Sequence, residues 1–261
     1  MLIEDLIKIP DASIVNYKIH KKDIFEAAEM TKTDKEYFVR YVQKIEWTCK
    51  FDENTIRIKP YQDEERVYLE SEFISIGLKN EFQKYFYNTG NVHNYDARLD
   101  RIADIILRFI PYPTLLCAEF RNRVKFYVSH ISESKADKEK ITLDEIIETD
   151  WINTNDLDDF DLELIDKLQI DKLDKINVYT FYDDIVTAII QYNGSKEAGK
   201  AVNLSPEEIQ GIIDQIRELE RKIDSLKAKM KKEVNFNKKV EYNVEIKDYK
   251  MEIELLKEKL K

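Results

Sequence analysis

The chain has 261 residues, of which 43% are hydrophobic and 36% are charged. This is enough apolar material for one sizeable domain, or for one domain with an appendage. Only five glycines and five prolines are present, which excludes long low-complexity linkers and glycine-built phosphate loops. Two cysteines and three histidines are too few for a zinc cluster and give no support to a disulfide framework.

The net charge of −10 argues against a protein that simply coats nucleic acid, but this charge is unevenly divided. Residues 206–261 hold 14 Lys and Arg against 13 Asp and Glu, whereas the preceding residues hold 28 against 39. The N-terminus carries an acidic residue where a signal peptide would be basic, and no apolar run approaches the ~18 residues of a membrane span. We therefore expect a soluble, cytoplasmic protein without a membrane segment.

The first elements are a helix and three strands. Residues 31–41 open like a helix, with Thr33 as a candidate N-cap. Apolar and polar residues alternate over 45–51, which predicts a strand with one buried face. We predict a second strand over 55–61, ended by a proline, and a longer third strand over 66–78.

A second helix follows, then a strand pair and a third helix. Residues 98–109 carry apolar side chains at helical spacing and end at the sequence IPYP. Residues 114–120 and 123–130 read as strands, and 176–191 as a strong amphipathic helix. The acidic run 156–166 fits a short surface helix better than a cation site.

These elements predict an α+β fold in which a mixed sheet is flanked by helices. We assign residues 1–192 to this core domain, 193–205 to a linker with two glycines, and 206–261 to a helical coiled-coil arm. The order of helix, three strands, helix and strand is also that of restriction-endonuclease-like cores.

The arm shows two apolar seams at alternating spacings of three and four residues. The first consists of Ile209, Ile212, Ile216, Leu219, Ile223, Leu226 and Met230, and the second of Tyr242, Ile246, Tyr249, Ile253, Leu256 and Leu260. The stretch VNFNKKVEYN lies between the seams and puts them out of heptad phase. Either one helix continues with a displaced stripe, or the chain folds back near Asn235–Asn237 as a hairpin.

Glu70 and Glu72 are the candidate catalytic residues of one alternative, a divergent metal-dependent nuclease. Two residues apart on a strand, they would point to one face, where paired carboxylates can hold Mg²⁺. The lysine that restriction-endonuclease-like sites place two residues after an acid is missing, so Lys44 or Lys59 would have to replace it. A solvated strand end is the structural alternative, and outside the nuclease reading we expect no cofactor.

Six lysines form a candidate nucleic-acid-binding patch in the arm, opposed by one glutamate. They are Lys227, Lys229, Lys231, Lys232, Lys238 and Lys239. On one continuous helix these positions scatter around the cylinder, so solvated flanks of a coiled coil are the alternative explanation. His20, His93 and His130 are far apart with no nucleophile motif beside them, and no Walker loop or dinucleotide fingerprint is present.

Several short motifs, in their order along the chain, resemble the bacterial domain-of-unknown-function family 4391. They include Ile9-Pro10, the IEW at 45–47, the glutamate-rich third strand, the IPYP and the TDW at 149–151. The helix INVYTFYDDIV and the segment KKEVNFNKKVEYN complete the resemblance.

The resemblance implies an accessory interaction protein of a restriction-like or phage-defence system. Its expected partners are a helicase or DNA methyltransferase of the same system, with DNA and a second copy bound through 206–261 as further candidates. It assigns no catalytic residue. We interpret Asn235, Asn237 and Asn243 as interaction residues that fix register or partner choice at the seam.

Overall fold

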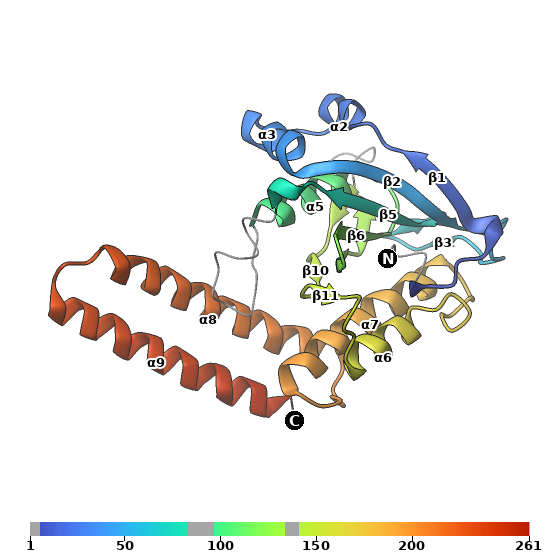
Figure 1. Cartoon of the computed structure of the whole chain (residues 1–261). Coiled ribbons are helices and arrows are strands. Elements are labelled where there is room, and N and C mark those ends of the chain that lie inside the picture. Colours follow the sequence, from blue (N-terminus) through green and yellow to red (C-terminus); the bar gives the residue numbers. More distant parts are fainter. Residues whose placement is uncertain (1–5, 83–96, 134–140, 261) are drawn as a thin grey trace. The chain divides into compact units, whose positions relative to one another are not determined.

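The computed structural model describes residues 6–82, 97–133 and 141–260 (Figure 1). The chain divides into two compact units, residues 1–189 and 190–261. The boundary falls inside helix α7 (Val178–Ala198). In the part of the chain that the structure describes, no helix combines the length and hydropathy needed to cross a membrane.

A mixed sheet forms the centre of the first unit, with strands in the order β1-β2-β5-β6-β7-β10 and β11 also paired to β7. The strands are β1 (Ile14–Lys18), β2 (Val42–Phe51), β5 (Ser71–Leu78), β6 (Thr114–Phe120), β7 (Arg123–Val128), β10 (Ile147–Glu148) and β11 (Ile152–Asn153). β5 and β6 run parallel, whereas the other pairs are antiparallel. The prediction of an α+β fold with a mixed, helix-flanked sheet is confirmed.

Every residue of β5 and β6 is buried, as expected for a parallel pair covered on both faces. Helix α5 (Ala97–Phe109) joins these two strands and lies behind them in Figure 1. It is tied to the sheet by Tyr127, whose hydroxyl donates to Asp100 over 3.0 Å. Helix α7 covers the other face, where the rings of Phe181 and Phe51 lie 5.2 Å apart.

Smaller elements complete the first unit. They are η1 (Asp11–Ser13), α2 (Lys21–Ala27), α3 (Lys32–Tyr41), η2 (Asn80–Phe82), α6 (Asp159–Lys167) and the strand pairs β3 (Tyr61–Gln62) with β4 (Val67–Tyr68) and β8 (Ile131–Glu133) with β9 (Ile141–Leu143). The N-cap of α3 is Thr31 and not Thr33. Thr31 and Asp34 form a capping box, with side-chain to main-chain distances of 3.1 and 2.9 Å.

The predicted strand over 55–61 is wrong for most of its length. The Asp52 carboxylate accepts hydrogen bonds from the main-chain N–H groups of Asn54 and Thr55, which turns the backbone at this point. The predicted strand over 66–78 is two elements, because β4 pairs with β3 while β5 joins the main sheet. Glu70 therefore lies just before β5 and not within a strand.

The second unit contains the end of α7 and a hairpin of two helices, α8 (Pro206–Lys232) and α9 (Phe236–Lys259). The chain turns back between them, so the hairpin alternative is the one observed (Figure 1). Buried seam residues are Ile209, Ile216, Leu219, Ile223, Leu226, Ile246, Ile253, Leu256 and Leu260, with Ile213 buried where Ile212 was expected.

The predicted linker 193–205 begins with helix, because α7 continues through Ala198. Gly194 lies inside α7 at a close helix contact and does not loosen the chain. A Cβ atom at this position would lie 2.6 Å from Cγ2 of Ile209, so glycine is what allows the approach. An ion pair of 3.0 Å between Lys257 and Glu197 also ties α9 to the end of α7.

Candidate functional site

Glu70 and Glu72 belong to a compact charged cluster at the start of β5. In the register of β2 and β5, Lys50 lies directly opposite Glu72. The Lys50 ammonium group is 3.0 Å from the carboxylate of Asp52 and 3.3 Å from that of Glu70. The cluster thus places three carboxyl groups around one ammonium group.

Glu72 is the buried member of this cluster, with 4% of its surface exposed. Burial disfavours its charged form, and the neighbouring Glu70 carboxylate adds repulsion and a hydrogen bond. Together these raise the pKa of Glu72 to about 8. At neutral pH Glu72 is therefore mainly protonated and can donate its hydrogen bond to Glu70.

The cluster differs from the site that the nuclease alternative predicts in the lysine that it contains. Lys44, opposite Gly77, pairs with Glu46, whereas Lys50 supplies the ammonium group beside the acids. The Glu70 carboxylate helps to raise the pKa of Glu72, which favours a protonated Glu72, and Lys50 forms an ion pair with Glu70 over 3.3 Å. Across residues 6–82, 97–133 and 141–260, no set of three or more His, Cys, Asp or Glu side chains is arranged to hold a metal ion. The fit to Mg²⁺ is poor.

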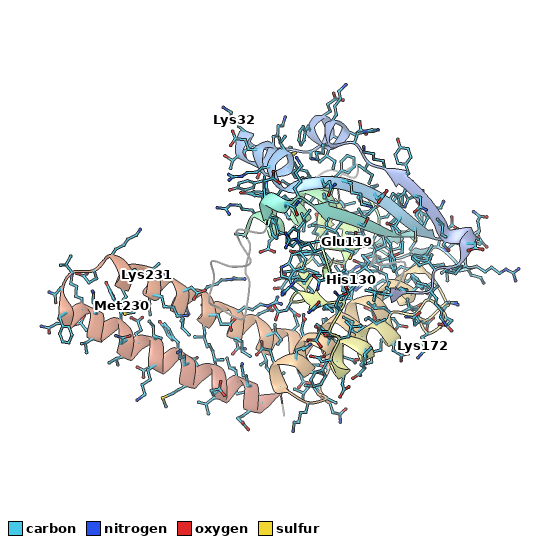
Figure 2. All side chains as sticks on the ribbon, in the orientation of Figure 1. Lys32, Glu119, His130, Lys172, Met230 and Lys231 are labelled. Carbon is cyan, nitrogen blue, oxygen red and sulfur yellow. The ribbon has the colours of Figure 1, made fainter. Side chains whose placement is uncertain are left out.

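The six predicted lysines are brought to one end of the helical hairpin. Four lie in the last two turns of α8 and two in the first turn of α9, on either side of the turn at residues 233–235. Figure 2 labels Lys231 and Met230 next to this turn. Lys227 forms an ion pair with Asp224 over 3.2 Å. The fold therefore gathers the lysines that a continuous helix would have separated.

Two apolar side chains are exposed at the same end. Val234 in the turn is 93% exposed, and Phe236 at the start of α9 is 76% exposed. The acidic residue between the two lysine groups, Glu233, accepts hydrogen bonds from the main-chain N–H groups of Val234 and Asn235. We call the six lysines with Val234 and Phe236 the hairpin tip.

The three asparagines have different positions from those expected. Asn235 is the N-cap of α9, and its side-chain oxygen accepts from the N–H groups of Asn237 and Lys238 at 2.9 and 3.4 Å. Asn237 and Asn243 are exposed, so none of the three is buried in the seam between the helices. Their expected role in partner choice stays a prediction.

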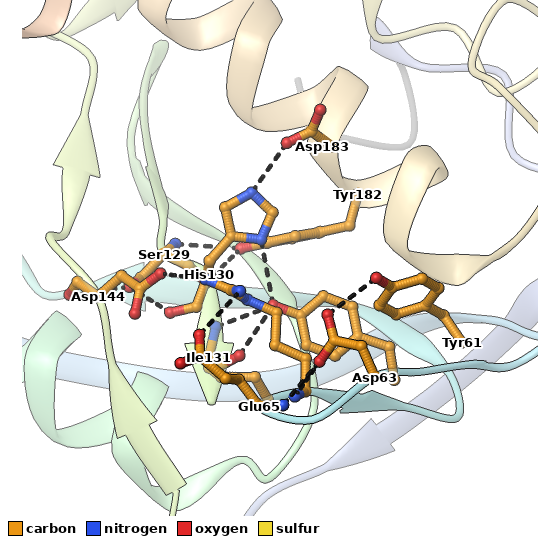
Figure 3. A network of polar contacts seen from close by, with 11 residues as sticks. Tyr61, Asp63, Glu65, Ser129, His130, Ile131, Asp144, Tyr182 and Asp183 are labelled. Carbon is orange, nitrogen blue, oxygen red and sulfur yellow. Dashed lines mark hydrogen bonds and ion pairs between the residues drawn. The ribbon is translucent and has the colours of Figure 1, made fainter. Parts of the chain in front are cut away.

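A polar and aromatic network around His130 was not anticipated (Figure 3). His130 Nδ1 lies 3.1 Å from the Tyr68 hydroxyl and Nε2 lies 3.1 Å from Asp183 of α7. The Tyr68 hydroxyl also accepts from Ile131 N and donates to Ile131 O, both at 3.0 Å. Burial raises the pKa of Tyr68 to about 12, so this hydroxyl remains protonated.

This network joins β4, β8 and α7, and its geometry is that of a structural clamp. The hydroxyl nearest to His130 in sequence, that of Ser129, donates to the main-chain carbonyls of His130 and Asp144. It is not directed at the imidazole, as a nucleophile of a catalytic triad would be. The residues that meet here are separated by more than 50 positions, which no sequence pattern reveals.

No curated protein and no solved structure matches the chain. A family model does match it, over residues 7–253, and carries the description "Domain of unknown function (DUF4391)". The match includes the sheet, the charged cluster and almost all of the helical hairpin. The chain therefore belongs to the DUF4391 family.

Proposed function

We propose that this protein is an accessory, DNA-associated interaction protein of a restriction-like or phage-defence system. In this role it works beside a helicase or DNA methyltransferase and contacts DNA with the hairpin tip. The genomic setting is carried over from the family resemblance described above. Coiled-coil packing of the arm and a restriction-endonuclease-like ancestry of the sheet are finer predictions within the same proposal.

The observation that carries the proposal is the composition of the hairpin tip. Between residues 227 and 239 there are six lysines and one glutamate, although the whole chain has a net charge of −10. Lysine side chains at such a site bind phosphates by releasing counterions, which makes binding sensitive to salt. An exposed aromatic ring among them, here Phe236, can stack on an unpaired base.

The acidic charge of the rest of the protein favours a DNA contact that is confined to the hairpin tip over one that covers a broad surface. Residues 1–205 hold 28 Lys and Arg against 39 Asp and Glu, so they repel a polyanion. Binding should therefore involve few phosphates and be weak for the protein alone. A DNA-bound partner such as a helicase or methyltransferase would raise the effective concentration at the tip.

The test is binding of the full chain to labelled duplex and single-stranded DNA over a range of salt concentrations. We expect Lys231→Glu with Lys232→Glu to weaken binding by about tenfold or more and to make its salt dependence shallower. The matched control is Lys250→Glu with Lys259→Glu, which makes the same change in net charge on α9 away from the tip. An equal loss in both variants, or no binding by the native chain, would contradict the proposal.

The same samples incubated with Mn²⁺ address the nuclease alternative. Cleavage that disappears in Glu72→Ala and persists in the exposed-site control Glu64→Ala would transfer the assignment to the charged cluster. The geometry of that cluster leads us to expect no cleavage.

A further inference from the structure

The hairpin tip carries positive charge that the protein itself does not neutralise. Among the described residues, Lys227 is the one lysine of the tip that forms an ion pair. Two lysines farther along the hairpin have acidic partners: Lys222 lies 2.7 Å from Glu218, and Lys257 lies 3.0 Å from Glu197. The other five lysines of the tip are therefore available to an anionic ligand.

The lysines of the tip lie on both flanks of the hairpin. At about 100° per residue, Lys229 and Lys231 fall on opposite sides of the buried seam of α8. By the same count, Lys238 and Lys239 fall on opposite sides of the buried seam of α9. Each flank thus has ammonium groups from both helices, so the tip is matched to a ligand with two lines of negative charge.

Two exposed apolar side chains, Val234 and Phe236, lie at the apex of the hairpin. The Glu233 carboxylate accepts from the main-chain N–H groups of Val234 and Asn235, both at 2.9 Å, and Asn235 accepts from that of Asn237 at 2.9 Å. These hydrogen bonds hold the turn in one conformation, which lowers the entropy lost when the apolar pair binds a ligand. Because side chains of a helix tilt toward its N-terminus, Phe236 at the start of α9 leans toward the apex.

A junction at which a DNA duplex opens into two single strands provides both features that the tip requires. Its last base pair offers a flat apolar face, and its two strands diverge as two lines of phosphates. In a fully paired duplex the base faces are covered by neighbouring bases, so that only base edges and phosphates are accessible. A single strand has bases for stacking but only one line of phosphates.

We propose that the hairpin tip recognises this junction, which we call forked DNA. Phe236 and Val234 pack on the last base pair, and the lysines of the two flanks contact the phosphates of the two strands. This inference rests on the proposed DNA contact and adds the structure of the DNA that is bound. Because every DNA carries phosphates, the preference for forked DNA depends on the apolar pair and on the second line of phosphates.

Competition for labelled forked DNA tests the preference of the full chain. The unlabelled competitors are forked DNA, single-stranded DNA and a relaxed circular duplex, which has no last base pair, at equal phosphate concentrations. We expect forked DNA to compete at least about tenfold more effectively than the other two. Equal competition by either of these overturns the inference but not the proposed DNA contact, whereas no binding of the labelled DNA overturns both.

Val234→Ala with Phe236→Ala separates the apolar contact from the charges. We expect this variant to bind forked DNA about tenfold more weakly and to bind circular duplex like the native chain. The matched control, Val244→Ala with Met251→Ala, removes two exposed apolar side chains of α9 away from the tip and should keep the native preference. Circular dichroism verifies the helix content of both variants. An unchanged preference in the first variant, or a lost preference in the control, would rule out the role of the apolar pair.

Phe236→Trp provides a direct readout of stacking. The indole ring keeps an aromatic face, so this variant should retain the preference for forked DNA, and stacking on a base should quench its fluorescence. We expect forked DNA to quench it beyond the background of Trp47 and Trp151, measured in the native chain, and circular duplex to leave it unchanged. Equal quenching by both DNAs would assign the ring to a contact along the duplex and reject the junction.

Discussion

Glu72 shows how one residue can make the stability of this protein depend on pH. Its carboxyl group is buried beside Glu70, and its pKa is raised to about 8 from an ordinary value of 4.5. The unfolded chain releases this proton at a lower pH than the folded chain does. The contribution of Glu72 to the free energy of unfolding is therefore greatest below about pH 4.5 and declines as the pH rises to about 8.

We expect Glu72→Gln to abolish this decline. Glutamine keeps the hydrogen-bonding shape without a charge to bury, so the variant should be more stable than the native chain near pH 8–9, by an amount on the order of a few kcal/mol. Chemical denaturation at several pH values measures the difference. Glu64→Gln, at an exposed turn, serves as the control and should follow the native curve.

At this scale the sequence revealed part of the charged cluster. The two-residue spacing of Glu70 and Glu72 correctly indicated that their carboxyl groups meet, although Glu70 lies just before the strand. Lys50 and Asp52 could not be identified as their neighbours, because this depends on the register between β2 and β5. Neither the alternation of a strand nor its length specifies the register with its partner.

At the scale of single elements, helix termini account for two of the stronger local interactions. Asn235 caps α9 directly after the hairpin turn, and Thr31 with Asp34 caps α3. Asp34 also accepts two hydrogen bonds from Arg101 of α5, at 3.0 and 3.1 Å. The caps thus fix where helices begin and, in the second case, how two helices are joined.

Asn235→Ala should lower the free energy of unfolding of the hairpin by about 1 kcal/mol, because two N–H groups of α9 lose their acceptor. Asn237→Ala is the matched control, since its exposed side chain caps nothing and alanine favours helix. Thermal unfolding followed by circular dichroism distinguishes them. An equal effect of both substitutions would reject the capping role of Asn235.

Asp34→Asn should reduce the resistance of the protein to acid. The Arg101 guanidinium, with Thr31, holds the pKa of Asp34 down at about 2, so this ion pair stabilises the fold above about pH 4 and loses its effect as the pH falls toward 2. The free energy of unfolding of the variant should be lower by about 2 kcal/mol at neutral pH, and it should fall less steeply as the pH is lowered toward 2. Acid titration followed by tryptophan fluorescence measures this, with the exposed-site variant Asp23→Asn as control.

Most helices and strands could be predicted from the sequence, because the spacing of apolar residues indicates which side chains are buried. The α5 helix and the two seams of the hairpin follow from apolar spacing alone. The failures occurred where side chains redirect the backbone: Asp52 turns the chain inside the predicted second strand. Gly194 suggested a linker, but the missing side chain instead allows Ile209 to approach α7.

At the scale of the whole molecule, the two units differ more clearly in net charge and composition than in any sequence motif. The acidic sheet unit contains the buried cluster and the His130 clamp, whereas the near-neutral hairpin concentrates lysines at its tip. The proposed DNA-contacting surface belongs to the hairpin. A sequence can indicate such a composition, but the turn that brings Lys232 and Lys238 together is a property of the fold.

The parallel pairing of β5 and β6 also has a consequence for how the chain acquires its structure. These neighbours are joined by a crossover that includes α5, so the sheet closes only after the two ends of a long connection have come together. The hairpin instead links residues that are close in sequence. We expect it to form within microseconds to milliseconds, ahead of the sheet, and so to be the earliest structured part of a refolding chain.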